Sequence, residues 1–195
     1  MMAGLPDTRL LRDFYARPST TVARELLGQR LVRILEHGQR LSGLICETEA
    51  YGGPDDEASH AYRFTRRSAI MYGPPGHAYV YLIYGMHYCL NAVTEPDGIP
   101  GAVLIRAILP QENVETMRTL RTGAADARLC DGPGKLCQAL SITTLLNGRD
   151  LVTGEQLFIE KAAPVAAQDI VITPRIGVRG NPEVRNRPWR FIWKR

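Results

Sequence analysis

Several features common in other protein classes are missing from this sequence. Its 195 residues contain no apolar run that approaches the roughly 20 residues of a membrane-spanning helix. The first fifteen residues, MMAGLPDTRLLRDFY, lack the apolar core of a signal peptide. Internal repeats and low-complexity segments are absent as well. We therefore expect a cytoplasmic protein with no membrane partner, and a single domain over residues 1–195 that is long enough to bury a sizeable core.

Metal-site spacing is also missing. The four cysteines form no C-x-x-C pair, and no histidines stand beside them at zinc-site spacing; they are Cys46, Cys89, Cys130 and Cys137. Buried thiols are the expected state, and no metal is predicted. The segment GPGKL fails the phosphate-loop pattern because leucine follows Lys135, so that lysine is interpreted as structural.

Positive charge is concentrated at the C-terminal end. The formal net charge is +4, yet residues 175–195 hold seven basic residues against one acid, so this segment is +6 and the remainder is −2. Trp189, Phe191 and Trp193 alternate with the basic residues. Such a stretch suits a polyanion backbone. A solvated amphipathic strand explains the pattern equally well.

Periodicity and turn residues predict an α+β domain dominated by antiparallel strands. Helices are expected over 19–28, 112–121 and 132–142, the first with Ser19 as N-cap and Gly28 just past its end. Hairpins are expected over 29–51, turning near His37 and Gly38, and over 73–93. A further strand is expected over 101–110, where Pro110 ends it. Other strands are expected within 156–162, 169–178 and 187–195. Residues 52–68 are interpreted as a loop with one helical turn.

The segment ICETEAY places two carboxylates close together. In a regular strand, alternation puts Ile45, Glu47, Glu49 and Tyr51 on one face. Two buried like charges at this spacing repel each other unless a base such as arginine pairs with them. Catalysis and a solvent-exposed strand face are both consistent with the pattern.

Arg106 interrupts the apolar strand GAVLIRAILP. A charge on a buried strand requires a partner, and Glu47 and Glu49 are the obvious candidates. The alternative to a catalytic role is a structural ion pair.

Seven of the eight tyrosines fall between residues 51 and 88. Tyrosines can line a slot that stacks on a flat ligand, but they also serve well in ordinary β-sheet cores. Tyr84 precedes Gly85 at the predicted turn of the 73–93 hairpin, where its ring would have little core to pack on.

Five motifs in order resemble the alkyladenine (3-methyladenine) DNA glycosylase family, in its bacterial form. They are ETEAYGGPDDEASHAY, MYGPPGHAYVYLIYGMHYCLN, AVLIRAILP, DGPGKLCQAL and RIGV. The resemblance runs from about Leu10 to Arg195. It implies a curved, largely antiparallel sheet flanked by helices, with a protruding hairpin that inserts into DNA. It also implies a hydrolase that removes damaged purines during base excision repair.

The resemblance assigns the chemistry to three residues. Glu49 matches the catalytic carboxylate, which activates a water and stabilises the oxocarbenium-like transition state. Arg106 matches a residue that holds the water and carboxylate, and the backbone carbonyl of Ile176 matches a third contact to the water. The family usually has valine at that last position.

The resemblance also assigns the recognition of the base. Tyr51, His60 and Tyr81 match the walls of the base slot, and Asn91 matches the residue that disfavours the amino group of guanine. Cationic bases alkylated at N3 or N7 stack well on such rings and leave without protonation, so we expect slower excision of hypoxanthine.

Extrusion of the base is assigned to the tip of the 73–93 hairpin. Tyr84 matches the residue that fills the gap left by the flipped nucleotide, and Met86 adds an apolar shoulder beside it. Gly85 allows the tight turn beneath the ring.

The remaining expectations concern the type of enzyme and its partners. Only three lysines occur, at 135, 161 and 194, and none lies beside Glu49 in a motif, so a strand-cleaving Schiff-base mechanism is not expected. The resemblance implies a monomer without cofactors that binds double-stranded DNA and associates with the nucleoid. Arg179, Arg185 and Arg187 are candidate phosphate contacts. Ser68 stands where the family is expected to have asparagine or threonine. We expect this difference to alter a contact within the loop or a contact to the DNA backbone.

Three rival hypotheses remain open. A non-catalytic damage sensor or RNA-binding protein accounts for the basic segment and the aromatics but not for Glu49 with Arg106. A glycoside or nucleoside hydrolase for small molecules does not need Tyr84. Strong salt dependence of the activity would count against such an enzyme. A metal-dependent hydrolase is the weakest, and activity in chelator excludes it.

Overall fold

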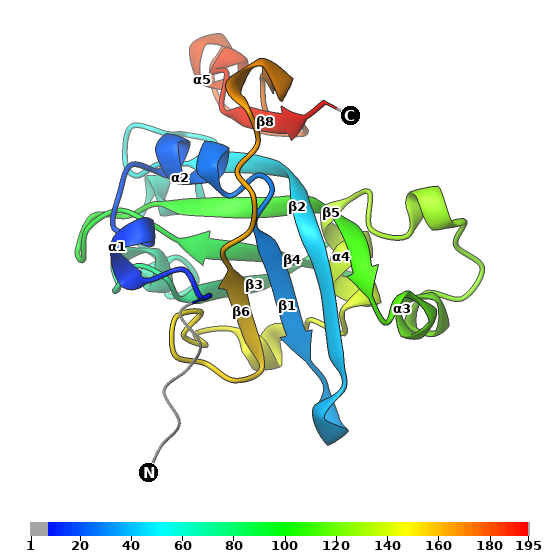
Figure 1. Cartoon of the computed structure of the whole chain (residues 1–195). Helices are drawn as coiled ribbons and strands as arrows, with labels where there is room; N and C mark the ends of the chain where they lie inside the picture. The colour runs from blue at the N-terminus through cyan, green and yellow to red at the C-terminus, as the bar shows by residue number, and fades with distance from the viewer. Residues whose placement is uncertain (1–7, 195) are drawn as a thin grey trace.

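The computed structural model describes residues 8–194, in which eight strands form one antiparallel sheet (Figure 1). The strands are β1 (Arg30–Ile34), β2 (Arg40–Tyr51), β3 (Ala78–Ile83), β4 (His87–Val93), β5 (Ala102–Glu112), β6 (Leu157–Glu160), β7 (Ile170–Thr173) and β8 (Arg190–Trp193). The main order is β3-β4-β5-β2-β1-β6. The sheet curves so that β1 and β6 run across the direction of β4 and β5. The predicted α+β class and the curved antiparallel sheet are confirmed.

The long strand β2 organises the sheet. It pairs with β5 along one edge, while its other edge pairs first with β1 and then, from Glu47 to Glu49, with β8. The strand β8 in turn carries β7. The C-terminal end of the chain therefore lies beside the two glutamates of β2.

Five short helices pack around the sheet. They are α1 (Arg12–Tyr15), α2 (Ser19–Glu25), α3 (Val114–Leu120), α4 (Pro133–Ala139) and α5 (Pro182–Asn186), with 3-10 turns at Glu36–Gly38, His60–Tyr62, Ala69–Tyr72, Asp126–Arg128, Thr144–Leu146 and Ala167–Asp169. Helix α2 packs on β2 and β5, and α4 packs on β4 and β5. Their apolar residues join the inner face of the sheet in one core, which anchors the strands that carry the site.

Two details of the predicted elements are wrong. Ser19 is the first residue of α2 and not its N-cap, because its hydroxyl hydrogen bonds with Thr94 and Glu95 instead of capping the helix. Strand β5 does not end at Pro110 but continues to Glu112, since proline is tolerated where its missing N–H leaves the pairing intact. Helices α1 and α5 are too short to give a periodic pattern and were not predicted.

The predicted face of β2 is also wrong at one position. Ile45 is buried in the core and does not share a face with the glutamates. The register of β2 against β5 shifts at Cys46, where Ile45 pairs with Ile108 but Glu47 pairs with Ala107. Such a bulge reverses the alternation of side chains. A sequence pattern cannot show where it occurs.

Two further predictions concern thiols and membranes. All four cysteines lie in the described part of the chain and are buried, and none is joined in a disulfide, as expected. Within residues 8–194, no helix is long and apolar enough to cross a membrane.

Candidate active site

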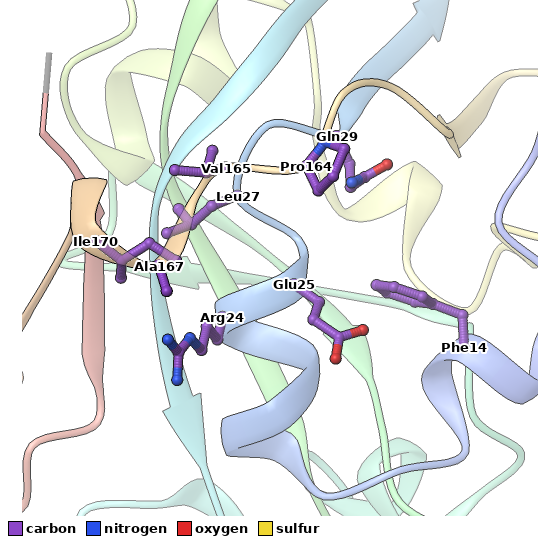
Figure 2. A pocket seen from close by; sticks show the side chains of 9 residues that line it. All are labelled: Phe14, Arg24, Glu25, Leu27, Gln29, Pro164, Val165, Ala167 and Ile170. Atoms are coloured by element: carbon purple, nitrogen blue, oxygen red, sulfur yellow. The ribbon is translucent and has the colours of Figure 1, made fainter.

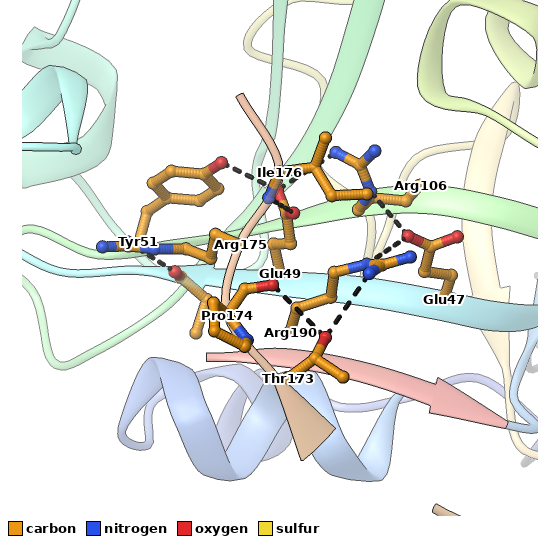
Figure 3. Close-up of polar contacts among 10 residues, drawn as sticks. Glu47, Glu49, Tyr51, Arg106, Thr173, Pro174, Arg175, Ile176 and Arg190 are labelled. Carbon is orange, nitrogen blue, oxygen red and sulfur yellow. Dashed lines mark hydrogen bonds and ion pairs between the residues drawn. The ribbon is translucent and has the colours of Figure 1, made fainter. Parts of the chain in front are cut away.

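Glu49 has a side chain with no exposed surface. Its Oε2 accepts hydrogen bonds from the Tyr51 hydroxyl at 2.8 Å and from Arg106 Nη1 at 3.1 Å. Its Oε1 accepts one from the backbone N–H of Ile176 at 2.7 Å (Figure 3). Three donors from three different segments therefore fix the position of this carboxylate.

Arg106 bridges the two glutamates of β2. Its Nε donates to Glu47 Oε1 at 2.7 Å, and Arg190 Nε from β8 donates to the same oxygen at 2.7 Å. Burial lowers the pKa of Arg106, but the carboxylates of Glu49 and Glu47 outweigh this effect and raise it. We call Glu47, Glu49, Arg106 and Arg190 the carboxylate cluster. Two arginines thus neutralise the two like charges that the sequence placed together.

Ile176 contacts Glu49 through its backbone, whereas the resemblance assigns its carbonyl to the attacking water. Its N–H, not its carbonyl, contacts the carboxylate, and its side chain is half exposed. The expected contact between the carbonyl and a water stays a prediction. The segment RIGV thus lies against Glu49.

The predicted slot residues His60 and Tyr81 lie together, with ring centroids 4.7 Å apart. Tyr79 joins them, since its hydroxyl lies 2.8 Å from His60 Nδ1. Burial, and then the charge of Arg67, lowers the pKa of His60 to about 4, so its ring is neutral at pH 7. Tyr81 in turn contributes, after burial and Glu49, to the raised pKa of Tyr51. Of the predicted slot residues, Tyr51 contacts the carboxylate cluster directly, through its hydrogen bond to Glu49.

Asn91 is buried in β4 opposite Tyr79 of β3. Its Nδ2 donates to the Tyr79 carbonyl at 3.0 Å, which fixes the orientation of the amide. The residue is therefore held rigidly within the hairpin that carries the tyrosines. Its effect on guanine stays a prediction.

The hairpin of β3 and β4 carries an exposed aromatic tip, as the sequence pattern predicts. Tyr84 is 81% exposed and has φ of 54°, and Gly85 follows with φ of 70°. A non-glycine residue in this region costs about 1–2 kcal/mol. Met86 is 70% exposed beside it. We call residues 84–86 the hairpin tip; its insertion into DNA stays a prediction.

The candidate phosphate contacts differ among themselves. Arg179 and Arg185 are exposed. Arg187 is half-buried, with its guanidinium 4.9 Å from the Trp189 ring and 3.8 Å from Glu183. Arg195 of the predicted basic stretch lies outside the described residues.

Comparison with known sequences decides the family. A family model described as methylpurine-DNA glycosylase (MPG) matches residues 13–195. Three relatives are each named "putative 3-methyladenine DNA glycosylase". The relative from Methanocella arvoryzae is 53% identical, and the match covers 95% of this chain and 92% of the relative. The relative from Carboxydothermus hydrogenoformans is 50% identical, with 95% of each chain covered. The relative from Alkaliphilus oremlandii is 46% identical, with 95% of this chain and 96% of the relative covered.

The chain belongs to the methylpurine-DNA glycosylase family. Membership confirms the expected enzyme class, a hydrolase that acts on N-glycosyl bonds, and a role in DNA repair. The coarse expectation that DNA is the partner is confirmed as well.

Ser68 is expected to depart from the family pattern, and the structure shows what its side chain contacts. Its side chain is fully buried, and its hydroxyl bonds the Arg63 carbonyl at 3.0 Å and accepts from the Thr65 N–H at 2.9 Å. The serine therefore holds the loop of residues 63–68. Whether this changes a contact to DNA stays a prediction.

Three residues near the site were not predicted from the sequence. Tyr79 was counted among the tyrosines but not placed in the slot, Arg67 lies 4.6 Å from the Tyr81 ring centroid, and Arg190 contacts Glu47. Each of these contacts joins segments far apart in the chain or depends on a side-chain direction. Only the alternation of Arg190 with Trp189 and Phe191 could have indicated an inward-facing base.

Two surface hollows have linings that do not include Glu49. One of about 220 Å³ lies between α2 and residues 164–170 (Figure 2). Another of about 240 Å³ is lined by Cys46, Glu47, Cys130 and Trp193 among others. Within residues 8–194, no three His, Cys, Asp or Glu side chains come together as a metal site. The geometry of the hydrogen bonds around Glu49 therefore marks the candidate site.

Proposed function

We propose that this protein is a monofunctional DNA glycosylase that hydrolyses the N-glycosidic bond of flipped purines. The bases are alkylated or deaminated: 3-methyladenine, 7-methylguanine, hypoxanthine and ethenoadenine. The observation that carries the proposal is the buried Glu49 carboxylate, held by three donors and adjoined by aromatic rings. A protein that only binds DNA has little use for a buried carboxylate near phosphates.

In this proposal Glu49 positions the attacking water. A carboxylate has about four acceptor positions. Among the described residues, Tyr51 and Arg106 occupy those of Oε2, and the Ile176 N–H occupies one of Oε1. A water at the remaining position of Oε1 lies beside Ile176, whose carbonyl then helps to orient it. Glu49 takes a proton from this water as it attacks the anomeric carbon.

The charges around Glu49 suit the transition state. As the glycosidic bond breaks, positive charge develops on the sugar, and the anionic carboxylate stabilises it. Arg106 and Tyr51 keep the carboxylate in one orientation; the pKa of Tyr51 is raised by burial and by Glu49, so its hydroxyl remains a donor. The product is an abasic site with the strand intact.

The aromatic slot supplies the selectivity. His60, Tyr81 and Tyr51 stack on the extruded base, and a cationic base gains additional attraction to the electron-rich rings. Asn91 opposes the exocyclic amino group of guanine. The exposed ring of Tyr84 fills the gap in the duplex, which offsets part of the few kcal/mol that extrusion costs. The protein acts as a monomer on double-stranded DNA.

Single-turnover excision tests the proposal. The substrate is a labelled duplex with one hypoxanthine, in chelator, and hot alkali reveals abasic sites. Glu49→Gln should lower the rate at least about 10³-fold and leave the dissociation constant for the duplex within about threefold. The exposed Glu115 supplies the matched control Glu115→Gln, which should behave as the wild type. If the wild type binds but excises neither hypoxanthine nor 3-methyladenine, the protein is a damage binder and the proposal is wrong.

A further inference from the structure

Arg175 and Asp56 form a buried ion pair next to the residues that hold Glu49. Arg175 Nη1 donates to Asp56 Oδ2 at 2.6 Å, and Nη2 donates to Oδ1 at 2.7 Å. Arg175 is 5% exposed and Asp56 is 1% exposed. This two-pronged geometry is the strong form of an arginine–carboxylate contact. Neither residue touches Glu49, so neither belongs to the chemistry described so far.

The pair joins four segments of the chain. Arg175 also donates to the Ala50 carbonyl at 3.0 Å and to the Val184 carbonyl at 3.3 Å. Asp56 accepts from the backbone N–H groups of Gly52 at 3.0 Å and Ala58 at 3.3 Å. The end of β2, the loop after it, the segment after β7 and helix α5 thus meet at one guanidinium and one carboxylate.

The same guanidinium lies against two aromatic rings. Its carbon is 4.8 Å from the centroid of Tyr51 (Figure 3) and 5.0 Å from that of Trp189. Tyr51 donates to Oε2 of Glu49, and Ile176, the neighbour of Arg175 in the chain, donates to Oε1. Two of the three donors that hold Glu49 are therefore anchored on Arg175, one through its ring and one through the backbone.

We propose that Asp56 and Arg175 are a positioning pair that sets the orientation of Glu49 and the spacing between it and the base slot. Asp56 extends this control toward the slot, because it fixes the loop that ends at Ser59 and His60. The inference rests on the proposed function, since it assigns to the pair an effect on the excision step. A buried ion pair is often no more stabilising than apolar residues of the same volume, so stability alone does not account for it, whereas a planar fork supplies geometry that a lysine cannot.

The test separates positioning from stability. Asp56→Asn and Arg175→Lys are compared with the wild type and Glu49→Gln in single-turnover excision of 7-methylguanine from a duplex, in chelator. This cationic lesion needs no proton on departure, so the pH dependence of the rate reports the enzyme. We expect the rate at saturating enzyme to fall about 30- to 100-fold, in line with the loss that a displacement of about 1 Å causes, and the dissociation constant for the duplex to stay within about threefold.

The pH profile gives a second readout. In both variants the pH profile of the rate should differ from that of the wild type, because Tyr51 and Ile176 then hold Glu49 in a different geometry. The matched control is Arg12 with Asp150, another ion pair with a 2.6 Å contact. Arg12→Lys and Asp150→Asn should lower the melting temperature but leave the rate and its pH profile unchanged.

Two outcomes overturn the inference. If the wild type is active and both variants excise within threefold of it, with an unshifted profile, the pair is only structural. If the wild type excises no lesion, the proposed function falls and the positioning role falls with it. Should Asp56→Asn fail to fold, Arg175→Lys decides, because it keeps the buried cation and removes only the fork.

Discussion

The carboxylate cluster and the hairpin tip are held in opposite ways. Glu49 has no exposed surface and accepts three hydrogen bonds from side chains and backbone of distant segments. Tyr84 is 81% exposed and lies at the turn that joins the paired strands β3 and β4. The cluster is therefore fixed by its tertiary contacts, whereas the tip is fixed by a turn.

This difference agrees with two separate tasks. A group that positions a water must not move, because small displacements cost large factors in rate. A wedge that enters DNA must be free of protein contacts beforehand, so that its apolar surface is available. Substitutions in the cluster should therefore change the chemical step, while those at the tip should change extrusion of the base.

After Glu49→Gln, the largest effect should come from Arg106→Lys. A lysine ammonium is a point charge on a flexible stem and cannot reproduce the fork that joins Glu47 Oε1 to Glu49 Oε2. We expect the single-turnover rate to fall about 10²-fold, as for loss of one preorganised donor, with unchanged binding of duplex. Quench-flow measurement at saturating enzyme checks this.

Arg40 provides the control at the opposite end of β2. It also bridges two glutamates, Glu112 and Glu160, with distances of 2.7 Å to each. Arg40→Lys should leave the rate unchanged. An equal loss of rate in both variants would show that any disturbance of β2 slows the enzyme, and the separation of the two regions would be lost.

A smaller effect is expected for Tyr84→Ser. Stacking of a base on an aromatic ring contributes about 2 kcal/mol in the middle of its usual range, so excision from a duplex should slow about 30-fold. Tyr84→Phe keeps the ring and should retain most of the activity. The same lesion in a single strand needs no wedge, and there Tyr84→Ser should match the wild type. A full loss of rate on the single strand would place Tyr84 in the chemical step instead.

Much of this architecture is encoded locally and could be predicted. The hairpins, the helix at α4 with Pro133 in its first turn, and the exposed Tyr84 follow from periodicity and turn residues. The pairing of Arg106 with both glutamates follows from the cost of burying unpaired charges. Contacts between charged residues on regular strands can be predicted in this way.

Features that depend on long-range packing could not be predicted. The bulge at Cys46 moves Ile45 into the core, and no local pattern specifies its position. The contact of Arg190 with Glu47 requires β8 to pair beside β2, although the two are about 140 residues apart. The Ser19 hydroxyl finds Thr94 and Glu95 only in the folded chain. The resemblance named positions, but tertiary contacts determine which atoms meet.

The basic residues offer a third comparison, within the C-terminal segment. If Arg179 and Arg185 contact phosphates, replacing both by alanine should reduce the slope of log K against log salt by about 1.8, since each phosphate contributes about 0.9. Arg187→Ala should change the slope less, because its guanidinium already stacks on Trp189. Fluorescence anisotropy across salt concentrations checks this. Arg24→Ala on α2 is the control, and an unchanged slope in the double variant would exclude these contacts.

The smallest effect should come from His60, and its sign follows from its pKa. The folded protein lowers the pKa of His60 from 6.5 to about 4, so the unfolded chain binds a proton between these values while the folded chain does not. This contribution to stability is therefore complete above pH 6.5 and is lost as the pH falls toward 4. The ring is partly exposed, and solvent screening reduces the change to a fraction of a kcal/mol.

His60→Gln isolates this contribution. Carboxylates such as Asp150, whose pKa is lowered by Arg12 against the opposing effect of burial, also lose stabilising interactions in acid, but they do so in both proteins. The difference in urea midpoint between wild type and variant should therefore change between pH 6.5 and 4 and stay constant above pH 6.5. A difference that is constant over the whole range would mean that the slot does not keep His60 neutral. The aromatic slot would then be as open to solvent as the hairpin tip, rather than intermediate between the tip and the carboxylate cluster.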